Sequence, residues 1–339
     1  MNNNSNDITD IILKHEKANA VVSQLPSRKY KITIQKLDPN FFIRCDSCET
    51  AYPIELIKKI FRAKGPGWLC DEIARDESPD YTGAALRWRI LSYVGEDAFK
   101  NSCILDFGCG SGASTCTMSR MFPTSRIVGI ELEQELLEIA KARVKFYGLK
   151  NVDLFLSPDP KNIPNSLGQF DHIVLSGVFE HLLPEERENL LPQLWSHLKL
   201  GGILFLHETP NVHFPIETHT TGGLPFINYL PKSIALPFAK KMSKRNLVSD
   251  SWTTLLRKGI RGGSQIEIMN ILANSEKKPT LMNPSRLGVN NRIELWYLSS
   301  DKKQHGAAKR ILRSMMGFLY AISGIELVPY LELAIRKDL

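Results

Sequence analysis

The sequence predicts an α/β protein with a doubly wound, mostly parallel sheet, a helical N-terminal section and an insert after the fifth strand. Three observations lead to this fold class. Short apolar strands alternate with helical segments between residues 103 and 207, which is typical of a parallel sheet covered on both faces. Three glycines directly follow the first of these strands. At about residue 209 the alternation gives way to a segment rich in Pro, Thr and basic residues.

These changes of pattern divide the chain into five expected parts. They are a mostly helical section at 1–98, a ligand-binding core at 99–210, a substrate-covering insert at 211–263, the end of the core at 264–300, and an amphipathic tail at 301–339. Apolar spacing in the first part predicts helices over Ile8–Val22, Tyr52–Ala63, Trp68–Ala74 and Gly83–Val94, with one or two strands in Lys29–Cys45.

The core is expected to contain five strands, at Cys103–Phe107, Arg126–Glu131, Val152–Leu156, Asp171–Ser176 and Ile203–His207. Helices are expected at Ser114–Met121, Gln134–Tyr147 and Glu185–Leu198, with Gly201 and Gly202 ending the last of them. Beyond the insert, the pattern predicts a helix over Ser264–Ala273, a strand over Arg292–Leu298 and an amphipathic helix around Lys309–Ile322.

Charge is concentrated in one segment. The net charge is +7, and Lys232–Arg261 alone holds eight basic residues and one acidic residue. Such a patch suits phosphate, an anionic substrate or an acidic membrane surface, and a solvated surface is the plain alternative. No apolar run reaches the ~18 residues of a membrane-spanning helix, and the polar start does not resemble a signal peptide. We expect the cytoplasm, with peripheral contact to the inner membrane face as an option.

The segment Asp106-Phe107-Gly108-Cys109-Gly110-Ser111-Gly112 predicts a ligand site, because glycines after a buried strand let the backbone approach a ligand closely. The run also fits the looser dinucleotide pattern G-x-G-x-x-A. Asp106 argues against that alternative, since its carboxylate would repel a pyrophosphate and would suit a ligand with an ammonium and a sulfonium. Glu131 ends the second strand, nineteen residues after Gly112, where an acid can accept hydrogen bonds from ribose hydroxyls.

Several of these motifs resemble class I S-adenosylmethionine-dependent methyltransferases. Residues 104–112 resemble the first motif of the family, and Val128-Gly129-Ile130-Glu131 resembles the second. Ser157-Pro158-Asp159 falls where the family places an acid near the adenine, although the proline is unusual. Residues 170–182 and 198–205 are similar to the motifs of the fourth and fifth strands, with Leu200 where proline is usual. The resemblance covers about residues 100–210 and is specific for the family, not for a substrate.

The resemblance implies a Rossmann-like methyltransferase fold and S-adenosylmethionine as cofactor. It implies cofactor contacts from Asp106, Gly108, Gly110, Gly112, Glu131, Asp159 and Ser176. Three later stretches, 214–222, 224–231 and 255–263, are more loosely similar to bacterial members found with polysaccharide and envelope genes. We therefore expect a small-molecule, glycan or lipid-linked acceptor, methylated at a hydroxyl, and no nucleic-acid partner. A nucleic-acid methyltransferase and a non-catalytic binding protein remain the alternatives.

Four histidines follow the fourth and fifth strands, namely His181, His207, His213 and His219. An alcohol acceptor must lose a proton, and a histidine is a natural base. We expect His219 to be catalytic, because it lies in the insert beside Glu217, and His181 to be the second candidate. His207 is expected to be structural, and His213 a loop residue.

Two further features raise the question of a metal. Glu180-His181 resembles part of the metal cluster of ubiquinone-type O-methyltransferases, but Gly177 stands where their other acid lies, so we expect no metal there. Cys45-Asp46-Ser47-Cys48 has zinc-ligand spacing without a second pair, and Cys70 stands alone in the sequence. We therefore expect these cysteines to be thiols.

Overall fold

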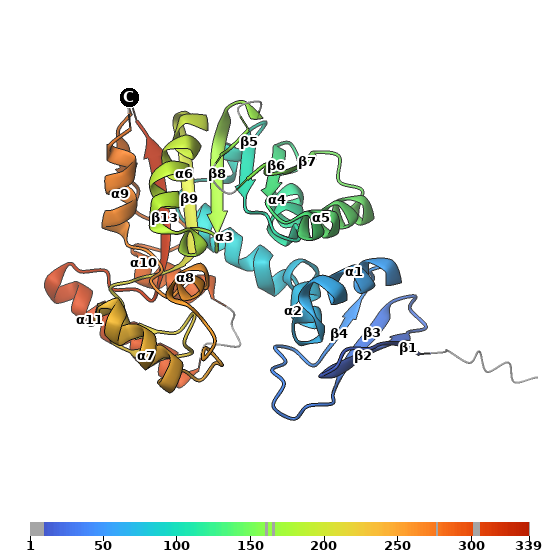
Figure 1. Cartoon of the computed structure of the whole chain (residues 1–339). Helices are drawn as coiled ribbons and strands as arrows, with labels where there is room; N and C mark the ends of the chain where they lie inside the picture. The colour runs from blue at the N-terminus through green and yellow to red at the C-terminus, as the bar shows by residue number, and fades with distance from the viewer. Residues whose placement is uncertain (1–9, 160–161, 165–166, 276, 301–305, 339) are drawn as a thin grey trace, which may run out of the picture.

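The computed structural model describes residues 10–159, 162–164, 167–275, 277–300 and 306–338. Figure 1 shows a large sheet with helices on both sides, and a smaller N-terminal sheet apart from it. The large sheet has seven strands in the order β12-β13-β9-β8-β5-β6-β7. The predicted doubly wound α/β fold is confirmed.

Five neighbouring strands of the large sheet run parallel to one another, and all of them were predicted. They are β5 (Cys103–Phe107), β6 (Arg126–Glu131), β7 (Val152–Leu156), β8 (Phe170–Ser176) and β9 (Leu198–Pro210). Because β8 and β9 flank β5 on one side and β6 and β7 lie on the other, chain order reverses beside β5. Ligands bind at such a switch point, outside the carboxyl ends of the strands.

The helices cover the two faces of the sheet in separate layers. On one face, α6 (Pro184–His197) and α9 (Gln265–Ala273) pack their leucines and isoleucines against β5, β8 and β9. On the other face, α3 (Ala84–Leu91), α4 (Ala113–Met121) and α10 (Arg292–Ser299) bury apolar side chains, such as Ile90, Met118 and Leu295. The helix α5 (Gln134–Tyr147) contacts β6 and β7 and also the N-terminal section. The helix α6 ends at His197, so Gly201 and Gly202 lie inside β9 and do not end the helix as predicted.

The N-terminal section is mixed, so the expectation of a mostly helical section is wrong. An antiparallel sheet, β1 (Ile11–Leu13), β2 (Ala18–Gln24), β3 (Tyr30–Lys36) and β4 (Ser47–Thr50), precedes α1 (Ile54–Lys64) and α2 (Pro66–Glu77). The predicted helix over Ile8–Val22 begins outside the described residues, and from residue 10 onward this segment contains two paired strands, with Ile11 opposite Val22. Its second half buries alternate residues against α1 and α2, and this period of two outweighs the helical spacing.

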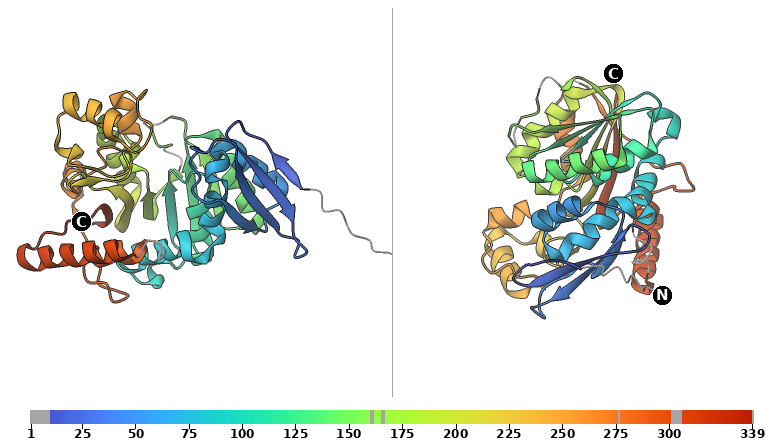
Figure 2. Two further views of the ribbon diagram at one scale, coloured as in Figure 1. Left: turned by 90° about the horizontal axis from the view of Figure 1, so that it is seen from below. Right: turned by 90° about the vertical axis from the view of Figure 1, so that its right-hand side faces the viewer.

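The insert forms a small body of its own beside the carboxyl ends of the strands. It contains β10 (Ile216–Glu217), β11 (Leu224–Pro225), α7 (Lys232–Met242) and α8 (Trp252–Arg257). An apolar cluster that includes Leu224, Ile227, Leu255 and Ile260 holds these pieces together. Figure 2 shows this part and the N-terminal section at opposite ends of the molecule when it is seen from below.

Two expectations for the C-terminal part are wrong. Residues 292–299 form α10 and not a strand, because Asn291 caps the helix by accepting a hydrogen bond from the Glu294 N–H at 2.9 Å. The sheet is completed instead by β12 (Pro279–Leu281) and β13 (Tyr330–Lys337), and β13 pairs antiparallel with β9. The expected tail at 301–339 therefore contributes a strand to the core, after the predicted amphipathic helix, which is α11 (Ala307–Ser323).

Candidate active site

The glycine loop lies between β5 and α4, and its glycines are required by positive φ angles and, at Gly108 and Gly112, by close packing. Gly108, Gly110 and Gly112 have φ angles of 72°, 56° and 83°, which favour glycine. A Cβ atom on Gly108 would lie 2.7 Å from Val178 Cγ2, and one on Gly112 would lie 2.7 Å from Ala140 Cβ. The loop therefore passes tightly between the end of β8 and α5, and Gly108 and Gly110 line the main cavity.

Glu131 joins the glycine loop to the end of β6. Its Oε2 accepts a hydrogen bond from the Gly110 N–H at 2.7 Å, and its Oε1 accepts from the N–H groups of Leu132 and Glu133 at 2.8 and 2.9 Å. Glu131 thus caps a loop and also lines the cavity. A carboxylate has about four lone-pair sites, so it can accept ribose hydroxyls while it keeps these bonds.

Asp106 lies behind the glycine loop and is only 1% exposed. Its Oδ2 accepts hydrogen bonds from Ser114 Oγ at 2.8 Å and from Thr115 Oγ1 at 2.6 Å, at the start of α4. Burial raises the pKa of Asp106 to about 6. In this structure Asp106 positions the loop and the helix, whereas the predicted contacts Asp159 and Ser176 lie on the cavity wall.

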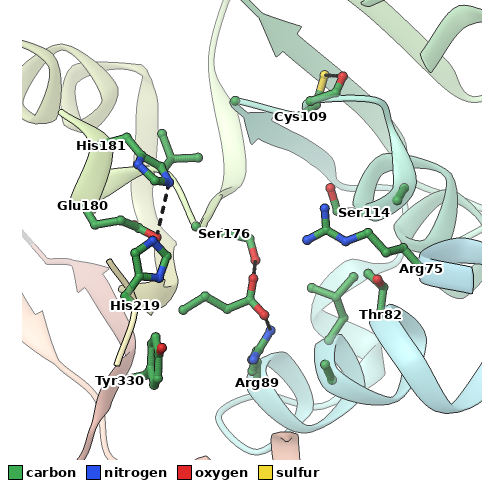
Figure 3. A pocket seen from close by; sticks show the side chains of 18 of the residues that line it. Arg75, Thr82, Arg89, Cys109, Ser114, Ser176, Glu180, His181, His219 and Tyr330 are labelled. Carbon is green, nitrogen blue, oxygen red and sulfur yellow. Dashed lines mark hydrogen bonds and ion pairs between the residues drawn. The ribbon is translucent and has the colours of Figure 1, made fainter. Parts of the chain in front are cut away.

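One cavity of about 1290 Å³ runs along the carboxyl ends of the strands. Its wall includes the glycine loop, Glu131 and Asp159 on one side. On the other side it includes Glu180, His181, His219 and Tyr330 (Figure 3). The structure thus brings both predicted catalytic histidines to the same cavity as the expected cofactor residues.

Glu180, His181 and His219 form a cluster in this wall, which we call the Glu–His–His cluster. One ligand atom of each residue lies within 4.8 Å of those of the other two. Glu180 and His181 follow β8, whereas His219 follows β10 in the insert. Burial raises the pKa of Glu180 to about 8. Burial, followed by the charges of His181 and Arg245, lowers the pKa of His219 to about 4.

Comparison with known proteins shows which family the part of the chain that carries this site resembles. A family model described as a methyltransferase domain matches residues 104–202, from β5 through the glycine loop and β8 to the start of β9. The chain contains a class I S-adenosylmethionine-dependent methyltransferase domain. The dinucleotide alternative for the glycine loop is therefore set aside.

Named relatives match part of the chain. A carboxy-S-adenosyl-L-methionine synthase of Hydrogenovibrio crunogenus is 32% identical over 37% of this chain and 50% of its own length. A demethylmenaquinone methyltransferase of Lactococcus lactis is 29% identical over 49% of this chain and 62% of its own length. Among solved structures, PKMT2 from Rickettsia typhi overlaps 76% of this chain and 53% of its own, at 16% identity and a TM-score of 0.45. The first two matches span about half to three fifths of each relative.

The methyltransferase domain is tied to the N-terminal section beneath the glycine loop. Arg143 of α5 donates from Nη1 to Glu72 Oε1 at 3.0 Å and to Ser111 Oγ at 2.7 Å. Its Nη2 donates to the Glu72 carbonyl at 2.7 Å and lies 3.6 Å from Asp76 Oδ1. Because Arg143 is fully buried, these contacts fix α2 against the loop that should hold the cofactor.

Sequence reasoning missed a second group of site residues, around Glu208 in β9. Leu331 and Leu333 of β13 pair with Thr209 and Leu206, so two residues of β9 lie opposite one residue of β13. This β-bulge gives Glu208 a φ angle of 62°, and such bulges re-aim side chains next to active sites. The carboxylate of Glu208 turns into the cavity of the methyltransferase domain, 3.5 Å from Ser176 Oγ.

Arg89 of α3 stabilises this bulge through ion pairs with Glu208 and Glu332. Its Nη1 lies 2.7 Å from Glu208 Oε1, and its Nε lies 3.1 Å from Glu332 Oε2. The Arg89 guanidinium lowers the pKa of Glu208 to about 2, against the opposing effect of burial. Arg89, Glu208 and Glu332 come from three distant segments of the chain. No motif in the sequence links these segments, so this group could not be predicted.

The remaining candidates are placed as follows. His207 is fully buried beside Glu332, as a structural residue would be, and His213 is exposed in the insert. Cys70 does not stand alone in space, because it contacts the thiol of Cys48, and this contact and burial raise its pKa. No helix in the described ranges is long and apolar enough to span a bilayer.

Proposed function

We propose that the protein transfers the methyl group of S-adenosylmethionine to a hydroxyl of a small-molecule, glycan or lipid-linked acceptor. The observation that carries this proposal is one continuous cavity that joins the glycine loop to the Glu–His–His cluster beneath the insert. Relatives named for carboxy-S-adenosyl-L-methionine and demethylmenaquinone chemistry favour a small molecule over nucleic acid.

In this reaction the acceptor oxygen forms a bond to the methyl carbon while the bond from that carbon to sulfur breaks. S-adenosylhomocysteine leaves, and the hydroxyl proton passes to a base or to solvent. The sulfonium already activates the methyl group, so alignment of the two reactants can supply much of the rate. We assign Glu131 to the ribose and Asp159 to the adenine end, and His219 and His181 to support of the transfer step.

Calorimetry with S-adenosylmethionine and S-adenosylhomocysteine tests the donor site. We expect both ligands to bind, and Glu131→Ala to weaken binding by about 1–3 kcal/mol, because a buried acceptor of hydrogen bonds is lost. Glu135→Ala, an exposed change on the neighbouring helix α5, should leave the affinity unchanged. No binding of either ligand, or binding of NAD in their place, would contradict the proposed function.

We also propose that α11 attaches the protein to an anionic membrane surface, where a lipid-linked acceptor would lie. One side of α11 packs Met316, Leu312 and Tyr320 against the domain. The other side exposes a stripe at helical spacing, consisting of Ile311, Met315, Phe318 and Ile322, which are 60–69% exposed. A helix that is apolar on both sides calls for a second apolar environment.

Charge near this stripe favours anionic lipid as the occupant. The helix α11 itself carries Lys309, Arg310 and Arg313 and no acidic residue. Amphipathic helices with apolar and basic side chains lie in the interface of anionic bilayers.

Sedimentation with phosphatidylglycerol-containing vesicles tests this attachment. The double variant Met315→Glu/Phe318→Glu should reduce vesicle binding by about tenfold or more, because two large side chains no longer enter the apolar layer. Leu37→Glu, at a similarly exposed leucine that follows the N-terminal strand β3, is the matched control and should bind as before. The proposal would be contradicted if the double variant bound vesicles as well as the parent chain. It would also be contradicted if the parent chain formed a dimer that the double variant abolishes. Tight binding of duplex DNA or RNA with steep salt dependence would contradict it as well.

A further inference from the structure

The Glu–His–His cluster assembles from two segments far apart in the sequence. Glu180 is 1% exposed, and its Oε1 lies 3.8 Å from His181 Nε2, which is too long for a hydrogen bond. Among the described residues, no lysine or arginine forms an ion pair with Glu180, although Thr209 Oγ1 donates to its Oε2 at 3.2 Å. Figure 3 shows the His219 ring beside Glu180 and His181, toward Tyr330. A buried carboxylate and two imidazoles thus share one small space.

The ring of His181 is oriented by the insert. Its Nδ1 lies 2.7 Å from the carbonyl oxygen of Arg257, so Nδ1 carries the proton and Nε2 presents a lone pair. Arg257 is itself fixed, because its guanidinium binds both carboxylate oxygens of Glu186 at 2.5 Å. Metal-ligating histidines almost always donate their other N–H to a carbonyl or carboxylate in this way.

His219 also faces the cluster without a competing partner. It forms no hydrogen bond with any residue in the described ranges. Gly259 packs against it, since a Cβ there would lie 2.9 Å from His219 Cδ2 and 3.1 Å from Glu180 Cγ. Glycine at this position lets the insert press His219 onto Glu180.

We propose that Glu180, His181 and His219 bind a divalent transition-metal cation. Two neutral imidazoles and one carboxylate suit ions such as Zn²⁺, Co²⁺ or Fe²⁺ better than Mg²⁺, which favours oxygen ligands. The sequence led us to expect no metal because Gly177 replaces an acid. The structure adds His219 from the insert as the third ligand, and it places Glu208 Oε2 3.6 Å from where a Gly177 Cβ would be.

Three protein ligands leave coordination positions open toward the cavity. A hydroxyl of the acceptor could occupy such a position, which would lower the pKa of that hydroxyl and fix its oxygen toward the donor methyl group. This role rests on the function proposed above, whereas cation binding by the cluster does not.

Titration of the chelator-treated full chain with Co²⁺, monitored by visible absorption, tests the site. Calorimetry with Zn²⁺ is carried out in parallel. We expect one equivalent to bind with weak d–d bands from nitrogen and oxygen ligands. His219→Ala should lower the affinity by about 100-fold or more, since loss of an outer-shell partner alone costs 10–100-fold. His213→Ala, an exposed histidine of the same insert, is the control and should bind like the parent chain.

The readouts separate this proposal from the methyltransferase activity. The metal site is overturned if the parent chain and His219→Ala bind Co²⁺ with equal affinity. It is also overturned if the only absorption bands are the intense ones of cobalt–thiolate bonds, from Cys45, Cys48 or Cys70. A second variant, Glu180→Gln, should also lose the cation while thermal unfolding shows that it remains folded. Metal binding that is intact in a chain unable to bind S-adenosylmethionine would support the metal site and refute the proposed function.

Discussion

Arg143→Met is expected to lower the free energy of unfolding by about 3–5 kcal/mol, the usual cost of removing one partner from a buried ion pair. Arg143 is 0% exposed and neutralises Glu72 and Asp76, which are 4% and 6% exposed. Methionine fills a similar volume but leaves the buried carboxylate of Asp76 without its ion-pair partner and that of Glu72 with only Arg75, at 3.7 Å. Urea denaturation at neutral pH measures the loss. We also expect weaker S-adenosylmethionine binding, because Ser111 loses its contact.

Two comparisons make this expectation specific. Lys141→Met, on the same helix, removes an exposed ion pair with Glu138 and should cost under about 1 kcal/mol. Adding Glu72→Gln to Arg143→Met should recover part of the stability, because residues in one network are not additive. A loss from Arg143→Met no larger than that from Lys141→Met would show that α2 and the glycine loop are held by other contacts.

Arg89→Met is expected to cost up to about 3–5 kcal/mol at neutral pH, because it leaves the buried carboxylate of Glu332 without its cation. The side chain of Glu208 is 39% exposed, so solvent screens its share of this loss. The sign of the pH dependence follows from the pKa of Glu208, which is lowered from 4.5 to about 2 in the folded protein. The Arg89–Glu208 pair therefore stabilises the fold fully above pH 4.5, and this contribution is lost as the pH falls toward 2.

The difference in stability between the parent chain and Arg89→Met should thus be largest at pH 7 and shrink below pH 4.5. Urea denaturation over this pH range provides the measurement. The matched control is Arg87→Met on the same helix, where an exposed pair with Glu96 at 3.5 Å is lost. A pH-independent difference would mean that Arg89 acts by packing and not by its charge.

The core was predictable because its signals are local. Each parallel strand is a short apolar run ended by turn residues, and the glycines after β5 reflect close contacts with Val178 and Ala140. The same reasoning failed where a segment depends on a distant partner. Residues 330–337 form a strand because they pair with β9. The apolar spacing of Ile8–Val22 is compatible with a helix, and only the pairing of β2 with β3 makes its second half a strand.

The candidate site divides in the same way. Most residues expected to bind the cofactor follow consecutive strands, and the structure places Gly108, Gly110, Glu131, Asp159 and Ser176 on the wall of one cavity. Arg89, Glu208 and Glu332 come together only through a β-bulge, and His219 reaches Glu180 only because the insert folds back over β8. Neither the bulge nor the path of the insert has a signal at fixed spacing in the chain.

The position of β13 has a consequence for biosynthesis. Ile203 of β9 pairs with Arg336 of β13, although the two residues are synthesised far apart in time. The strand β13 is made after every other strand of its sheet. Until β13 arrives, β9 is an unpaired apolar edge, which nascent chains expose at the risk of aggregation. The sheet can therefore close only once β13 has been synthesised, which makes this non-local pairing a late step in folding.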